Sequence, residues 1–424
     1  MVGTDRFVSI RRVEGHVTDS SVSTTSNNGF TNPASAVAPT QRRPALVVIV
    51  LANFLFFFGY RLWQSLFSNF AVQELGVRAD QMGLIQSIRE IPGLLGFSVG
   101  LLALLLVEMR IAGLSVVLMG IGIALTGRVG SLSGLVVSTL MMSIGFHFFM
   151  SSNSSAVLLL VGDDETPRTL GRLSSVGALA ALAGAGIVFL TLDALGFRTL
   201  FYVTGALLIV GGLVLLPWAR QPVRPVRTRR RTPIHRRYWL YYVLEFLMGS
   251  RRHIFTTFAI FLLVQEHRVT AQTITVLFVV NDLIGTFLYR QFGGIIIRFG
   301  ERRVLTLNFV FLIFVFLGYA YIPLLPVLYV LFVADQVLFG FRISLQSYFQ
   351  KIAVQPQDIT PNISLGQTIN HIAAVIIPVV GGMVWEVVGS RYTFLIGVGV
   401  AVLSLVLVQW MHTERSDSSG LRDG

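Results

Sequence analysis

Charged and imidazole side chains occur inside segments of this sequence that are otherwise almost wholly apolar. The charged residues include Arg61, Arg89, Glu90, Glu245, Arg251, Arg252, Asp282, Asp335 and Arg342, and the histidines are His147, His253 and His371. Guanidinium groups bind carboxylates and phosphates through paired hydrogen bonds, whereas carboxylates and imidazoles take up and release protons. These residue types therefore favour binding of a charged small molecule, internal ion pairing or proton transfer.

The segments that hold these residues require a lipid bilayer. Hydrophobic residues make up 54% of the 424 residues and charged residues 13%, against about 25% charged residues in soluble domains. The mean hydropathy is +0.72. A membrane-spanning helix needs about 20 apolar residues. Twelve segments have close to that length or more: 44–70, 81–106, 111–127, 132–160, 173–194, 199–218, 239–264, 272–297, 304–323, 326–350, 362–386 and 392–411. The sequence predicts an all-α integral membrane protein with twelve transmembrane helices.

A basic loop divides these segments into two sets of six. Residues 219–238 contain eight arginines, and we expect them to link an N-terminal bundle (44–218) to a C-terminal bundle (239–411). The polar residues 1–43 predict a disordered tail, and residues 412–424 a second tail. Basic residues near the span ends concentrate on the side of the central loop, so both termini are expected in the cytoplasm and the protein in the inner (plasma) membrane.

The two sets of six resemble each other in sequence. Residues 72–93 align with residues 264–285, and both stretches begin with Val-Gln-Glu. In this alignment Glu90 falls on Asp282. The duplication predicts two pseudo-symmetric six-helix bundles, and repeats of this kind are found in transporters.

Arg61 and Glu90 are predicted to lie at the same depth. Each is nine residues from the outer end of its span, which is roughly 13 Å along a helix. Neighbouring antiparallel helices would bring the two together, and the repeat predicts the same for His253 and Asp282. Two interpretations remain open: structural ion pairs, or pairs that a substrate or a proton opens. Because Arg89 and Glu90 differ by about 100° around the helix, we expect their side chains to point in different directions.

A glycine- and arginine-rich loop follows the eighth span, where residues 293–303 read GGIIIRFGERR. The twelve spans, the duplicated halves, the basic loop and this motif together resemble the major facilitator superfamily over residues 44–412. The resemblance implies a gating loop formed by Gly293, Arg298, Gly300 and Arg302. Ile297 stands where the family carries Asp, and the first-half copy, LLVEMRIAG, is degraded.

In that family the first, fourth, seventh and tenth helices line a central cavity. The resemblance therefore makes their basic side chains the candidate substrate-binding residues: Arg61, His147, Arg251, Arg252, His253 and Arg342. Converging guanidinium groups favour an anionic substrate. Internal neutralisation by acidic residues, or a relay of cations or protons, are the alternatives. The candidate proton-coupling or ion-pairing residues are Glu90, Arg89, Asp282, Glu245 and Asp335.

The predicted function is secondary active transport of a small solute, an organic anion, by alternating access driven by an ion gradient or by exchange. One alternative is a proton-coupled exporter of drugs or metabolites. Another is a membrane scaffold or sensor that keeps the fold without transport. The expected partners are the small-molecule substrate and the lipid bilayer, with no nucleic acid, and we expect a monomer.

The sequence predicts no catalytic chemistry. It contains no cysteine, which excludes thiolate metal sites and cysteine nucleophiles. It also contains no phosphate-binding G-x-x-x-x-G-K-[ST] loop, no H-E-x-x-H motif and no nucleophile elbow. Its seven histidines are too scattered along the chain to predict a metal site. We therefore expect neither enzyme activity nor a cofactor or metal.

Overall fold

The described part of the chain is built from α-helices. The computed structural model describes residues 39–161, 165–219 and 234–412, and within these ranges it contains no strand. Ten of the described helices are long and apolar enough to cross a bilayer, against twelve predicted spans. One of the ten, Arg168–Trp218, contains two predicted spans, and the second predicted span is divided into helices of fewer than 18 residues. The predicted tails and most of the basic linker lie outside the described residues.

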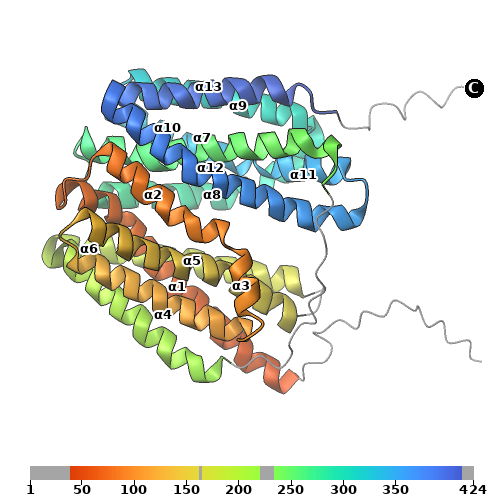
Figure 1. Ribbon diagram of the computed structural model, residues 1–424. Helices are drawn as coiled ribbons and strands as arrows, with labels where there is room; N and C mark the ends of the chain where they lie inside the picture. The colour runs from red at the N-terminus through yellow and green to blue at the C-terminus, as the bar shows by residue number, and fades with distance from the viewer. Residues whose placement is uncertain (1–38, 162–164, 220–233, 413–424) are drawn as a thin grey trace, which may run out of the picture. The chain divides into compact units, whose positions relative to one another are not determined.

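The helices of the two halves follow one another along the chain (Figure 1). The first half contains α1 (Pro39–Gln73), α2 (Ala79–Leu94), α3 (Phe97–Leu102), α4 (Glu108–Arg128), α5 (Leu132–Leu160), α6 (Thr166–Leu215) and η2 (Leu216–Trp218). The second half contains η3 (Arg236–Tyr238), α7 (Trp239–Gln265), α8 (Ala271–Phe299), α9 (Glu301–Tyr321), α10 (Leu325–Gly340), α11 (Ile343–Ile352), η4 (Pro356–Asp358), α12 (Ile359–Val388) and α13 (Ser390–Val408).

All twelve predicted spans are helical, although several of their boundaries differ. The fifth and sixth spans are continuous in α6, because the chain turns at Gly196 (φ 71°, ψ 168°) without a loop. The second span is divided into α2 and α3 just after Pro92, whose ring cannot donate a backbone hydrogen bond. The tenth span is likewise divided into α10 and α11. α1 begins at Pro39, before the predicted start at residue 44.

Glycines allow α2 and α12 to approach at backbone distance. A side chain at Gly83 of α2 would meet the carbonyl group of Pro378 in α12, and one at Gly382 would meet the backbone of Ala79. Contacts between small residues are a main source of helix association in membranes, where lipid removes the hydrophobic drive for packing. Because α2 belongs to the first half and α12 to the second, this contact joins the two halves (Figure 1).

Gly196→Ala should destabilise the protein, because a side chain strains a backbone at positive φ. We expect a cost of about 1–3 kcal/mol and a lower midpoint of thermal unfolding in detergent. Gly186→Ala is the matched control, since it lies in the same helix with open space around it and should be neutral or slightly stabilising. Equal midpoints for the two variants would show that the turn at Gly196 does not need glycine.

Candidate functional site

Most of the intramembrane charges lie in pairs of opposite sign. The pairs and their N–O distances are Arg61–Asp282 at 2.5 Å, Arg89–Glu90 at 2.9 Å, Arg251–Asp335 at 2.6 Å and Arg342–Glu245 at 3.1 Å. Each unpaired charge in a bilayer costs about 2.5–3.5 kcal/mol on insertion scales, so pairing is what allows this set to persist. Internal neutralisation, one of the alternatives above, therefore describes much of the set.

The predicted pairing of Arg61 with Glu90, and of His253 with Asp282, is wrong. Arg61 of α1 contacts Asp282 of α8 in the opposite half, and its guanidinium group lies over a ring of that helix. Glu90 of α2 faces α5 and α12 instead. His253 of α7 is buried and interacts electrostatically with Glu90. Depth along the span carries no information about the rotation of each helix about its axis.

A group of three arginines lies on α7 and at the break between α10 and α11. Arg251 and Arg252 both place their guanidinium carbon over the ring of Phe339, at 5.1 and 4.5 Å from its centroid. Arg252 also interacts electrostatically with Arg342 and with Glu90. Among the described residues, Arg252 has no carboxylate within salt-bridge distance. It differs in this from Arg61, Arg89, Arg251 and Arg342, each of which contacts a carboxylate.

Glu90 is the centre of a second cluster, which three helices build. Its Oε1 accepts a hydrogen bond from Arg89 Nη2, so the prediction that the two side chains diverge is wrong at their tips: the long arginine side chain spans the 100° between them. Its Oε2 lies 3.2 Å from His371 Nδ1 of α12 and 3.9 Å from His147 Nε2 of α5. The carboxylate is 9% exposed.

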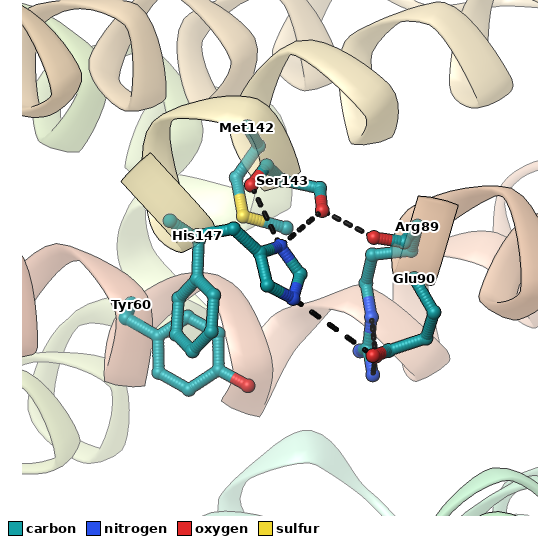
Figure 2. Close-up of a pocket in the computed structure, with 7 residues that line it drawn as sticks. Tyr60, Arg89, Glu90, Met142, Ser143 and His147 are labelled. Carbon is teal, nitrogen blue, oxygen red and sulfur yellow. Dashed lines mark hydrogen bonds and ion pairs between the residues drawn. The ribbon is translucent and has the colours of Figure 1, made fainter. Parts of the chain in front are cut away.

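A small pocket opens beside this cluster (Figure 2). It is lined by Tyr60, Arg89, Glu90, Met142, Ser143, Phe146 and His147. Ser143 fixes the geometry twice: its hydroxyl donates to the Arg89 carbonyl group, and its own carbonyl oxygen lies 3.0 Å from His147 Nδ1. The helix α5 therefore holds both the imidazole and the α2 backbone in place.

The sequence prediction missed part of this cluster. His371 was recognised as an imidazole inside an apolar segment but was not placed with the site residues, and Ser143 carried no signal in the sequence. The histidines are scattered along the sequence, but two of them are not scattered in space. The fold brings His147, His371 and Glu90 together, with one ligand atom of each within 4.8 Å of the others.

The predicted gating residues lie along the end of α8 and the start of α9. They are Gly293, Arg298, Gly300 and Arg302, and both arginines are exposed. Gly300 has a positive φ of 80° and separates the two helices. Beside it, buried Glu301 contacts Lys351 Nζ at 2.5 Å and accepts a hydrogen bond from the Ser347 hydroxyl at 2.7 Å. This unpredicted carboxylate links α9 to α11 within the second half.

The helical fold and the number of long apolar helices define a multi-pass membrane protein. Residues 49–361 match the Major Facilitator Superfamily. The chain belongs to this family, whose members bind small-molecule substrates within the membrane.

Solved structures of several transporters have the same fold. The nucleoside transporter NupG superposes with a TM-score of 0.71 at 17% identity, over 87% of this chain and 98% of that one. A bacterial homolog of the human lysosomal transporter Spinster, inward-facing and unoccupied, gives 0.70 at 14% identity, over 88% and 97%. An inward-facing bacterial homologue of the iron transporter ferroportin gives 0.66 at 16% identity, over 86% and 98%. No curated protein matches the sequence. At these identities the similarity describes the fold and not the substrate.

The buried Arg251–Asp335 pair should respond differently to loss of one partner and of both. Its side chains are 1% and 2% exposed, so Asp335→Asn leaves a buried guanidinium group without its counter-ion, at a cost of about 3–5 kcal/mol. Adding Arg251→Met should recover much of this loss, because no charge then stays unpaired.

The measurement is the midpoint of thermal unfolding of each variant in detergent. Arg303→Met, which removes an exposed arginine from α9, is the control for loss of a cation alone and should leave the midpoint unchanged. A double variant no more stable than Asp335→Asn would show that the two residues do not depend on each other.

Proposed function

We propose that this transporter moves a small organic anion across the inner membrane by alternating access, with both termini in the cytoplasm. The observation that carries the proposal is the charge balance inside the membrane. Among the described side chains, Arg61, Arg89, Arg251 and Arg342 each contact a carboxylate inside the membrane, whereas Arg252 does not. An unbalanced cation in a low-dielectric region is costly, and an anionic substrate would supply the missing charge.

The donors around Arg252 suit a carboxylate-containing substrate. Nε and Nη2 of Arg251, and Nε of Arg342, are buried and have no hydrogen-bond partner among the described residues. Each of these arginines is already paired with its own carboxylate through another nitrogen. The remaining N–H groups are therefore free to donate to oxygen acceptors. Planar guanidinium groups bind carboxylates in this way, with two parallel hydrogen bonds.

Contacts between the two halves gather toward one end of the helices. Asn69 of α1 donates to the carbonyl group of Val269, and Gln272 of α8 donates to Asp193 of α6. The glycine contacts between α2 and α12 lie near the start of α2 and the end of α12. The Arg61–Asp282 pair lies in the second half of α1 and the first half of α8, toward the same end. With the termini in the cytoplasm this is the outer side. We infer a state closed to the outside, which rocking of the halves would open.

The energy source belongs to the same proposal. Transport is driven by an ion gradient or by exchange of one anion for another, and Glu90 and Asp282 remain the carboxylates proposed for proton coupling. Both lie where the two halves meet: Asp282 contacts Arg61 of the first half, and Glu90 contacts His371 of the second. A change in their charge would therefore act directly on the contact between the halves.

Arg252→Ala should weaken anion binding. A charge-assisted hydrogen bond contributes about 1.5–3 kcal/mol, which corresponds to roughly a 10- to 150-fold loss of affinity. The ligand is the mono- or dicarboxylate that most raises the thermal midpoint of the purified wild-type protein, and transport is its uptake into proteoliposomes. Arg128→Ala removes an exposed arginine from the end of α4 and should transport like wild type. An Arg252→Ala variant that binds and transports normally would remove the anion site.

Asp282→Asn should open the outer side more often, because it removes a charge pair between the halves. The natural chain has no cysteine, so Asn69→Cys introduces a single thiol at a buried position of this contact. We expect a membrane-impermeant thiol reagent to label it faster from outside when Asp282→Asn is added. Arg198→Gln breaks the Arg198–Glu74 pair inside the first half and should leave the labelling rate unchanged. Equal rates in all backgrounds would contradict the assigned role of the pair.

A further inference from the structure

Three side chains from three helices converge on one point between the halves. Glu90 lies on α2, His147 on α5 and His371 on α12, and one ligand atom from each lies within 4.8 Å of the others. Glu90 Oε2 is 3.2 Å from His371 Nδ1 and 3.9 Å from His147 Nε2. In a tetrahedral zinc site with bonds of 2.0–2.1 Å the ligand atoms are about 3.3 Å apart. Small side-chain rotations would therefore bring the three atoms to ligating distance.

Hydrogen bonds around the cluster orient its ligand atoms inward. His147 Nδ1 lies 3.0 Å from the carbonyl oxygen of Ser143, which fixes a proton on Nδ1 and directs the Nε2 lone pair toward Glu90. Arg89 occupies the other carboxylate oxygen, Oε1, at 2.9 Å. Histidine ligands of metals are commonly held by such a bond from the second ring nitrogen to a carbonyl group, and ligating carboxylates are hydrogen-bonded in turn.

A cation would be stabilised between His147 Nε2 and Glu90 Oε2, which face each other. A distance of 3.9 Å from His147 Nε2 to Glu90 Oε2 is too long for a hydrogen bond, so a lone pair and a carboxylate oxygen face each other across a gap. Gly93 gives the imidazoles their room, because a side chain there would lie 2.8 Å from His147 Nε2 and closer still to the ring of His371. Glu90 and His147 also line the pocket of Figure 2, which offers space for a further ligand.

We propose that Glu90, His147 and His371 bind one divalent transition-metal ion such as Zn²⁺ or Co²⁺. Two imidazoles and a carboxylate suit these ions, whereas Mg²⁺ and Ca²⁺ prefer oxygen ligands alone. Three protein ligands leave a fourth position open toward the pocket, for water or a substrate group. The inference goes beyond the proposed anion transport and does not depend on it, because the site uses none of the three arginines on α7 and at the α10–α11 break.

The electrostatic surroundings set limits on the affinity. Arg89 and Arg252 both interact with Glu90, so a dication enters a region that already contains two cations. The site is therefore expected to bind less tightly than a structural zinc site with thiolate ligands. Its position has a further effect: the ion would connect α12 of the second half to α2 and α5 of the first, and would stabilise the state in which these helices meet.

Binding of Co²⁺ and Zn²⁺ to the purified full-length chain, without a polyhistidine tag, tests the proposal. Visible absorption reports the coordination geometry of Co²⁺, and calorimetry gives the stoichiometry and affinity for Zn²⁺. We expect one ion per chain, and at least a tenfold loss of affinity in Glu90→Gln, His147→Gln and His371→Gln. His267→Gln is the control, because it removes an imidazole between α7 and α8, outside the cluster; it should bind like wild type.

A second variant keeps the test decisive if the ligand variants fold poorly. Gly93→Ala leaves all three ligands in place but puts a methyl group against both imidazoles, so it should weaken metal binding while the protein still elutes as a single species. The proposal is overturned if wild type shows no saturable binding, or if the Glu90, His147 and His371 variants bind as tightly as wild type. Loss of metal binding in His267→Gln to the same extent would also overturn it. Anion uptake enters none of these readouts.

Discussion

Ions placed in a bilayer need partners, and this requirement organises the whole molecule. Lipid offers no hydrogen bonds and little dielectric screening, so a counter-ion stabilises a buried charge strongly, and three of the pairs join different helices or helix segments. The Arg251–Asp335 pair ties α7 to α10, and the Arg342–Glu245 pair ties α7 to the α10–α11 break. The Arg61–Asp282 pair joins α1 to α8 across the two halves. An unpaired charge would destabilise the protein in the bilayer, so these ion pairs help to determine which helices become neighbours.

Two chemically different regions result from this pairing. The second half carries a guanidinium-rich group around Phe339, whose charges do not fully cancel. The meeting point of the halves carries Glu90 with two imidazoles. The first region has an excess of N–H donors, while the second presents lone pairs. Arg252 interacts electrostatically with Glu90, so the charge state of one region affects the other across the centre of the protein.

The fold was predictable from the sequence because spans depend on composition alone. Hydropathy predicted twelve helical spans, and these spans, the internal repeat, the basic loop and the motif around Gly300 together indicated the family. Side-chain partners were less predictable, because they depend on the rotation of each helix. Arg61 and Glu90 have the same predicted depth, yet they face different helices. His371 and Glu90 are far apart in sequence and in opposite halves, so no local pattern relates them. The alignment of the two halves does not match these two residues with each other either.

The contact between α2 and α12 has a mechanical consequence. Gly83 and Gly382 place backbone directly against backbone, with no side chain at those positions that could rotate aside to let the helices separate gradually. Packed surfaces of this kind tend to occupy discrete arrangements and not a continuum. We therefore expect the two helices to separate as rigid bodies, losing the whole backbone contact in one step. In the proposed outward-closed state this contact would resist partial leakage, because an intermediate spacing would lose the close packing without yet admitting a solute.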